Sequence, residues 1–181
     1  MNSLNCRAMG LVGALLVCAT VAAAQQPVAS APPDPRDVIA EKMPFNTPYG
    51  APISAQRAQS ALQAAVVEAT KRGWAVNIAV ADSGGNLVAF LRMDGAQLAS
   101  IAVAQHKARA AVKYRRPTKF FEEAVQKQDY KYVLTLDDVI ASRGGIPLLE
   151  DGKLIGAIGC SGASGAQDEV VCTAGAATIN R

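Results

Sequence analysis

The spacing of hydrophobic residues changes several times along the chain, and each change marks an expected boundary between helix and strand. Between Ser54 and Gly73, apolar residues such as Ala58 and Leu62 recur every three or four positions. Ser54 is a favourable residue at a helix N-terminus, and Gly73 is typical of a helix C-terminus. This stretch is therefore expected to form one helix whose apolar side faces a core.

Further along, the spacing becomes two, which is typical of strands in a hairpin. AVNIAVAD and NLVAFLRMD flank the turn DSGG, where Gly84 and Gly85 would supply positive φ values. GGIPLLED and GKLIGAIGCSG flank a second turn at Asp151 and Gly152. The pattern predicts two β-hairpins.

Three more helices are expected, over residues 97–113, over residues 118–126 with Thr118 as the cap, and over residues 168–179 with Asp168 as the cap. Residues 129–143 are only loosely patterned. Paired antiparallel strands separated by helices indicate the α+β fold class, with an antiparallel sheet flanked by helices. The 181 residues suit a single domain, which is expected over residues 53–181.

The first 24 residues have the pattern of a secretory signal peptide. Arg7 precedes the apolar run MGLVGALLVCATVAAA, which is too short to span a bilayer, and three alanines supply a cleavage signal before Gln25. A lipoprotein signal at Cys18 is the weaker alternative, because Val17 stands where a small residue is expected. The protein is expected to be exported, either periplasmic or secreted.

Residues 25–52 are rich in proline and are expected to form a linker followed by an extended arm with Phe45 and Tyr49. The arm would pack either on its own domain or on a neighbour. No second apolar stretch reaches membrane length, so no membrane span is expected in the mature form.

Charge and cysteine content narrow the class of protein. Loss of Arg7 with the signal lowers the formal net charge from +3 to +2, which argues against a nucleic-acid binder. Cys160 and Cys172 remain, and in an oxidising compartment they either pair or lie apart on a strand and a helix. A zinc site is not expected, because the cysteines and the lone histidine lack ligand spacing.

The stretch AQHKARAAVKYRRPTKFF carries the candidate chemistry, because it holds the only histidine, His106, among several cations. On a helical wheel one side would cover the sheet (Ile101, Ala104, Ala108 and Val112), and His106 lies nearly opposite with small apolar neighbours (Ala99, Val103 and Ala110). This second stripe is either a subunit interface or the floor of a ligand site, and in an oligomer it could be both.

Three blocks, IAVADSGGNLVAFLRMDGA, SIAVAQHKARAAVKYRRPT and GGIPLLEDGKLIGAIGCSGASGAQDEVV, resemble the GlcG/HbpS-like haem-binding family. The resemblance covers about residues 53–179, with all blocks in the family's order. It implies a profilin-like α+β fold, assembly into a homo-oligomer, and haem binding. Some members are described as haem-degrading or iron-binding, and others belong to glycolate operons, so the resemblance alone does not assign the chemistry.

If haem is bound, His106 is the expected axial iron ligand, because an imidazole nitrogen ligates haem iron well. Arg115 and Arg116 would hold the propionates with their planar guanidinium groups. Tyr114 would stack on the ring or act as a phenolate ligand. Thr118 offers a hydroxyl but is more simply a helix cap. The alternatives are a solvent or interface histidine and a solvated helix end.

One position departs from the family pattern. Members commonly read K-A-x-T-A in this helix, with the threonine regarded as a haem contact, and the present chain reads KARAA with Ala110 there. Either His106, one turn before Ala110, takes over ligation, or haem binds weakly or not at all.

The other polar motifs favour structural roles. The glycine-rich CSGASGAQDE precedes a helix and could hold an anion, although its own acidic residues favour a turn. Asp82 and Asp94 bracket the first hairpin, where turn roles are expected before iron binding. No hydrolase, nucleotide-binding or metalloprotease motif is present.

Two functions therefore remain. The first is an exported haem-binding oligomer that sequesters, senses or degrades haem. The second is an accessory or structural oligomer, or a protein related to small organic acids, without haem activity.

Overall fold

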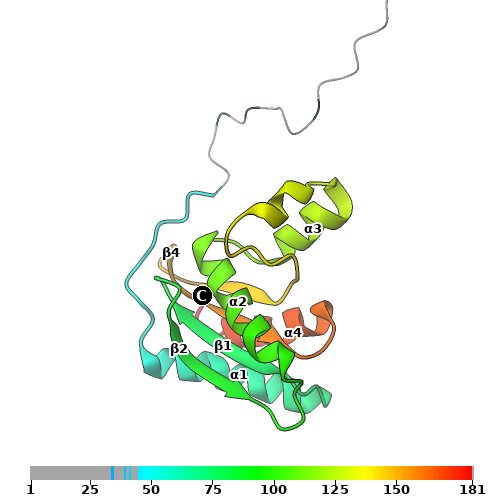
Figure 1. Ribbon diagram of the computed structural model, residues 1–181. Helices are drawn as coiled ribbons and strands as arrows, with labels where there is room; N and C mark the ends of the chain where they lie inside the picture. The colour runs from blue at the N-terminus through cyan, green and yellow to red at the C-terminus, as the bar shows by residue number, and fades with distance from the viewer. Residues whose placement is uncertain (1–33, 35–38, 40, 42–44, 181) are drawn as a thin grey trace, which may run out of the picture. The chain divides into compact units, whose positions relative to one another are not determined.

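The computed structural model describes residues 34, 39, 41 and 45–180, nearly all within one unit of the chain, Glu41–Arg181. The elements follow one another as α1 (Ala55–Arg72), β1 (Asn77–Asp82), β2 (Leu87–Arg92), α2 (Ala99–Lys113), α3 (Lys119–Gln128), the 3-10 helix η2 (Lys131–Thr135), β3 (Gly145–Glu150), β4 (Lys153–Ser161) and α4 (Gly165–Ala176) (Figure 1). The expected signal peptide lies outside the described residues. None of the helices in the described part of the chain is long and apolar enough to cross a membrane.

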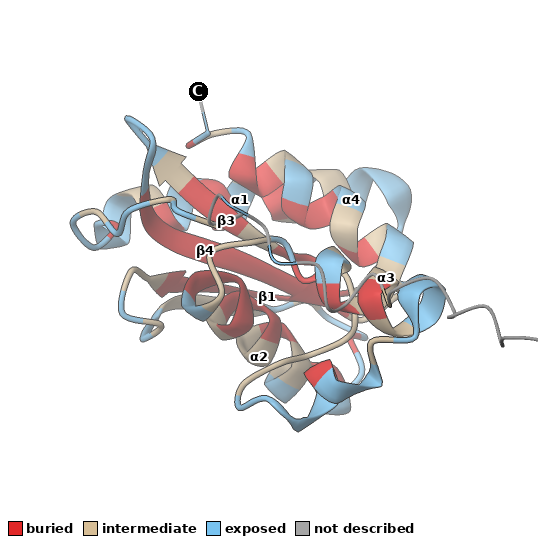
Figure 2. Ribbon diagram, turned by 90° about the horizontal axis from the view of Figure 1, so that it is seen from above, coloured by how far each residue is buried: buried red, intermediate tan, exposed pale blue. Residues whose placement is uncertain are grey.

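The four strands form one antiparallel sheet in the order β2-β1-β4-β3, so the expected α+β fold class is confirmed. Figure 2 shows α1 and α4 on one side of the sheet and α2 on the other. The two central strands, β1 and β4, are buried along nearly their whole length, whereas β2 is an edge strand and only half-buried. The sheet therefore separates two cores, one on each face.

The core beneath α2 is built largely from alanines and one glycine, and this composition lets the helix lie very close to the sheet. Ala104, Ala108, Ala111 and Ala157 are buried in it. A Cβ atom built on Gly159 would lie 2.2 Å from the carbonyl oxygen of Ala104. Backbone meets backbone at this crossing, so α2 has one possible depth on the sheet.

The wheel predicted for α2 was right for most of the sheet-facing side and wrong for its edges. Ala104, Ala108 and Val112 are buried as expected, but Ile101 is only half-buried. Lys107 and Ala110 are fully buried although neither was predicted to face the core. The helix is thus covered on more than one side.

Local sequence signals place α1 and the two hairpins as predicted. The Ser54 hydroxyl accepts a hydrogen bond from the Arg57 amide, and Gly73 ends the helix at φ 69°. In the first hairpin only Gly85 has a positive φ, so the prediction for Gly84 was wrong. The turn is instead held by the Asp82 carboxylate, which accepts from backbone amides at 2.8 and 2.9 Å.

The caps of the last two helices differ from the prediction. Ser164, not Asp168, caps α4, and it forms a reciprocal capping box with Gln167. Asp168 lies inside the first turn and is buried. Thr118 stands before α3 but makes no side-chain cap, because its hydroxyl accepts from the Gly145 amide at 2.9 Å.

The extended arm packs on its own domain. The Gly50 amide donates to the carbonyl of Leu154 at 2.7 Å, and the Leu154 amide donates to the carbonyl of Pro48 at 2.8 Å. Both bonds use the part of β4 that extends beyond the end of β1. The Tyr49 hydroxyl then reaches the last carbonyls of α2, at 3.1 and 3.2 Å. The arm thus continues the sheet and ends against α2.

Cys160 and Cys172 form a disulfide with a Cα–Cα distance of 5.6 Å. The bond joins β4 to α4, and both residues are fully buried. Of the two alternatives that the sequence left open, pairing is the one found.

Candidate functional site

His106 lies on the side of α2 that faces away from the sheet, and this side is exposed at Ala99 but covered towards Ala110. Its ring is partly buried, and the Nε2 atom is buried without a hydrogen-bond partner among the described residues. Ala110, one turn further on, is fully buried. The sequence left this small-residue stripe as either a subunit interface or the floor of a ligand site, and in the described structure its second half is buried by the chain itself.

Residues 129–143, here named the covering segment, pack across the end of α2. The Tyr114 hydroxyl donates to the carbonyl of Asp137 at 2.6 Å. Val139 and Ala141 join Tyr114 in an apolar cluster around Phe121 of α3. A segment whose hydrophobic residues show little periodicity thus packs over helices α2 and α3. Packing on the surface of these helices requires only a few apolar residues and no regular spacing.

Asp138 of the covering segment pairs with two cations of α2. Its Oδ1 atom lies 3.3 Å from Nε of Arg109, and its Oδ2 atom accepts a hydrogen bond from Lys113. The hydrogen bond from Lys113 lowers the pKa of Asp138, and the charges of Lys113, Arg109 and His106 add to this effect. His106 is therefore part of the same electrostatic neighbourhood.

A second charge pair lies on the sheet-facing side of α2 and is deeply buried. Nζ of Lys107 lies 2.8 Å from Oδ2 of Asp168, and the two side chains are 1% and 3% exposed. Nζ also donates to the carbonyl of Cys160, and Oδ1 of Asp168 accepts from the Ala163 amide. Burial raises the pKa of Asp168, and the Lys107 ammonium opposes that rise.

The glycine-rich motif before α4 has a structural role, and Asp168 of this pair takes part in it. The amides at that helix start are used by Ser164, Gln167 and Asp168 of the chain itself. The motif is therefore a structural turn, as the sequence favoured. Sequence gave no signal for the pairing of Lys107 with Asp168, because the partners are 61 residues apart.

The two arginines predicted to hold propionates contact the arm. Arg115 has a positive φ of 53° and donates to the carbonyl of Thr47 at 3.1 Å, and its guanidinium lies over the Tyr49 ring. Arg116 lies 3.0 Å from the centre of the Phe45 ring and 4.6 Å from that of Phe120. Both cations are thus engaged by aromatic and carbonyl groups.

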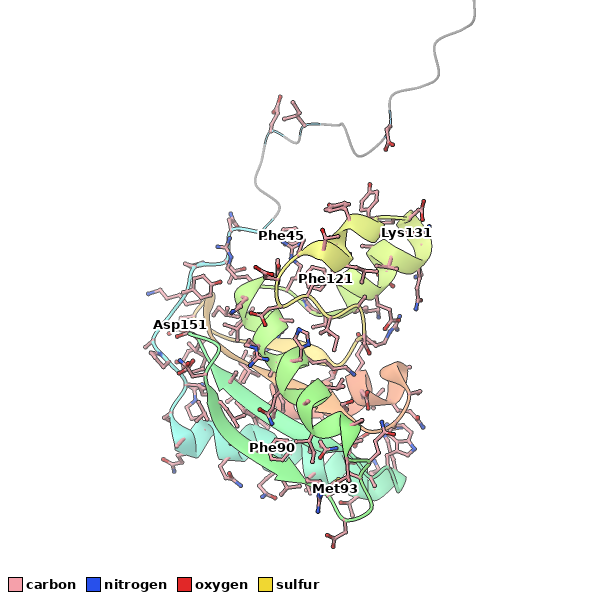
Figure 3. The ribbon with its side chains drawn as sticks, viewed as in Figure 1. Phe45, Phe90, Met93, Phe121, Lys131 and Asp151 are labelled. Carbon is pink, nitrogen blue, oxygen red and sulfur yellow. A yellow bond between two sulfur atoms is a disulfide. The ribbon has the colours of Figure 1, made fainter. Side chains whose placement is uncertain are left out.

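The environment of Arg116 is unusually apolar for a cation. The rings of Phe45 and Phe121, both labelled in Figure 3, have their centres 3.0 and 5.7 Å from the Arg116 guanidinium. Burial lowers the pKa of Arg116, and the neighbouring Arg115 lowers it further. The cluster fastens the arm to α2 and α3 through cation–π contacts.

The remaining predicted residues have structural partners. Tyr114 packs edge-on against Phe121, with ring centres 5.0 Å apart, while its hydroxyl holds the covering segment. Thr118 is fully buried and bonds to Gly145 through both its hydroxyl and its amide. The described structure brings Tyr114, Arg116 and Phe121 together, but it places His106 with Arg109, Lys113 and Asp138 instead.

A separate open depression of about 530 Å³ lies at the β3–β4 turn, lined by Arg57, Glu150, Asp151, Thr178 and Ile179. Arg57 is paired there with Glu150 at 2.5 Å. This depression involves α1 and the end of α4, on the opposite side of the sheet from α2, so it is distinct from the surroundings of His106.

The fold and the histidine-bearing helix define a class of small α+β domains in which a four-stranded antiparallel sheet carries helices on both faces. Residues 53–177 match the family described as haem degrading protein HbpS-like. The chain belongs to this family, as its sequence blocks indicated.

Three relatives illustrate the match. Protein GlcG of Escherichia coli K12 is 42% identical over 109 residues, which are 60% of this chain and 81% of GlcG. A double mutant of HbpS from Streptomyces reticuli is 31% identical, with a TM-score of 0.68, and the match covers 85% of this chain and all of that one. A PduOC:heme complex is 29% identical, with a TM-score of 0.65 and coverage of 72% and 96%.

Proposed function

We propose that this protein binds haem and that His106 ligates the iron. The observation that carries the proposal is the Nε2 atom of His106, which is buried and has no hydrogen-bond partner in the part of the chain that the structure describes. Buried polar atoms nearly always have a hydrogen-bond partner. A buried imidazole nitrogen without one is therefore a good candidate for binding a metal ion such as haem iron. Imidazole is a common axial ligand of haem iron, and one relative of known structure is a complex with haem.

The surroundings of His106 fit a flat dianionic ligand. Val103 and Ala110 are small neighbours on its side of α2, and Arg109 and Lys113 supply positive charge nearby. Ala110 offers no hydroxyl, so His106 takes the role that the family's threonine leaves open. When bound, haem would supply any redox chemistry, while the chain positions the ring and its carboxylates.

We propose no direct haem contact for the other residues predicted from the sequence, which lie near the site: Tyr114, Arg115, Arg116 and Thr118. Each has a structural partner in the described structure, so a role in haem binding would require that partner to be exchanged. We propose haem binding rather than haem degradation as the function, because binding requires only the iron ligand His106 and the cations Arg109 and Lys113.

We also propose that the protein is exported, to the periplasm or outside the cell. Two observations support this location. The N-terminal run has the pattern of a secretory signal, and the Cys160–Cys172 disulfide is typical of oxidising compartments. Homo-oligomer formation stays a prediction from the family resemblance.

A haemin titration followed by absorbance tests the proposal. His106 is the only histidine, so the protein is purified with a tag that contains none. We expect a saturable Soret band at one haemin per chain in the wild type. His106→Ala is expected to shift or abolish that band, whereas Gln105→Ala, the matched control on the same helix, retains it.

A titration that never saturates would contradict haem binding and favour the second function, an oligomer without haem activity. A saturable band that His106→Ala leaves unchanged would contradict the ligand assignment alone. Size-exclusion chromatography of the same samples measures the oligomeric state and the stoichiometry per subunit.

A further inference from the structure

Two cations near His106 are bound to one carboxylate that belongs to the chain itself. Arg109 and Lys113 both pair with Asp138, whose side chain is 27% exposed. The cations are more exposed, at 42% and 48%, so an external anion can reach them. A haem propionate is also a carboxylate, so it can form the same charge-assisted hydrogen bonds with Arg109 and Lys113 that Asp138 forms.

The positions of these cations along α2 match the dimensions of haem. Lys113 follows His106 by seven residues, which is two helical turns and about 10 Å. This length is comparable to the distance from a haem iron to its propionate carboxylates. Arg109 lies between them, three residues after His106 and on the same side of the helix.

By contrast, the arginines chosen from sequence are committed elsewhere. Arg115 is bonded to the arm at Thr47, and Arg116 lies over the ring of Phe45. A ligand would gain little charge from them without detaching the arm. Arg109 and Lys113, which already bind the carboxylate of Asp138, are therefore the better candidates for binding a haem propionate.

We propose that Arg109 and Lys113 receive a haem propionate and that Asp138 occupies its place in the haem-free protein. The inference rests on the proposed function and assigns the residues that recognise the ligand's carboxylates. Asp138 then competes with haem for these cations. Binding exchanges one carboxylate for another and moves the covering segment away from His106.

The exchange explains two features together. The cations remain paired without the ligand, which avoids two neighbouring uncompensated charges on α2. The same segment that supplies Asp138 also packs beside the helix that carries the buried Nε2 atom of His106. Haem would therefore displace a single element to reach both its iron ligand and its carboxylate partners.

The test compares Asp138→Asn with Asp137→Asn, two neighbouring changes that remove the same charge. Asp137 contributes its backbone carbonyl to Tyr114, which the substitution keeps. We expect Asp138→Asn to tighten haemin binding by about two- to twenty-five-fold, because each exposed ion pair competes by a factor of about 1.4 to 5. Asp137→Asn is expected to change the affinity by less than about twofold.

A double-mutant cycle makes the assignment specific. In the Arg109→Ala, Lys113→Ala background, haemin binding is expected to weaken and the effect of Asp138→Asn to disappear. Lys71→Ala, which removes a cation from α1 on the other face of the sheet, serves as the control for net charge. Circular dichroism confirms that each variant is folded.

Two porphyrin probes separate this inference from the iron assignment. Iron-free protoporphyrin keeps its propionates, so fluorescence quenching of this probe should respond to Asp138→Asn even in His106→Ala. Haemin dimethyl ester lacks the charges, so Asp138→Asn should leave its affinity unchanged.

The outcomes are distinguishable. If wild-type protein binds no porphyrin and Asp138→Asn binds none either, the proposed function and the inference both fail. If haemin binds but Asp138→Asn matches Asp137→Asn, or if the diester responds as strongly as haemin, the inference alone is overturned. A gain confined to probes with free carboxylates supports it.

Discussion

The buried pair of Lys107 and Asp168 gives the sharpest stability prediction. Replacing Lys107 by Met keeps most of the side-chain volume but leaves a carboxylate in a site that is 3% exposed. Breaking a buried pair in this way costs about 3–5 kcal/mol. The cost is limited by protonation, because Asp168 can become neutral in the variant.

The limit can be worked out from the pKa of the carboxyl. Protonating a group of ordinary pKa near 4 at pH 7 costs about 4 kcal/mol, at 1.36 kcal/mol per pH unit. Both routes therefore place the loss at about 4 kcal/mol at pH 7. Burial already raises the pKa of Asp168, and loss of the Lys107 charge raises it further.

The sign of the pH dependence follows. A folded-state pKa above the unfolded value means that the folded variant holds a proton that the unfolded chain releases. The stability of Lys107→Met should therefore fall as pH rises from about 4 towards the raised pKa. At pH 5 the loss should be smaller than at pH 7, by at most about 2.7 kcal/mol, because the raised pKa of Asp168 in the wild type gives part of the same slope there.

Urea unfolding with the disulfide intact, at pH 7 and pH 5, measures this loss. Lys113→Met, an exposed paired lysine, is the control and should cost less than about 1 kcal/mol. Adding Asp168→Asn to Lys107→Met should remove the pH dependence. A loss below about 1 kcal/mol for Lys107→Met at pH 7, or one that pH does not change, would refute the reasoning.

Two further predictions concern the packing of the sheet. Changing Cys160 and Cys172 together to alanine should lower the free energy of unfolding by roughly 3 kcal/mol, and reductant should then have no further effect in urea unfolding; equal stability of the oxidised wild type and the double variant would contradict this. Gly159→Ala should cost about 3 kcal/mol, because its Cβ would meet the Ala104 carbonyl at 2.2 Å and backbone cannot yield. Thermal unfolding measures the loss for Gly159→Ala. Gly152→Ala cannot serve as the control, because Gly152 has a positive φ and alanine there would add backbone strain of its own.

Sequence patterns predicted the sheet and the order of elements because these depend on local spacing. Alternation gave both hairpins, and Ser54 and Gly73 gave the bounds of α1. The end of the chain was less predictable, because Ser164 and Asp168 are both acceptable caps and only packing decides between them. Asp168 lies inside the first turn of α4 and pairs with Lys107, a residue far away in sequence, so it does not cap the helix.

The residues of the candidate site were chosen from the sequence by residue type. His106 is the lone histidine, and Arg115 and Arg116 are adjacent arginines, so these three were expected to contact haem. The structure shows that Arg115 and Arg116 contact the arm, and for this reason we propose Arg109 and Lys113, which follow His106 at helical spacing, as the cations of the site. The contribution of Asp138 could not be predicted, because the covering segment has no periodicity to place it.

The close contact between Gly159 and α2 has a consequence for how sequences of this fold can diverge. Substitutions where α2 crosses Gly159, at Ala104 and Ala108, are restricted to the smallest residues, since backbone atoms set the spacing there. Positions on the opposite side of α2 are not restricted by this contact. Variation in ligand preference among related chains should therefore accumulate on that outer side and on the segment that covers it, while the depth of the helix on the sheet stays constant.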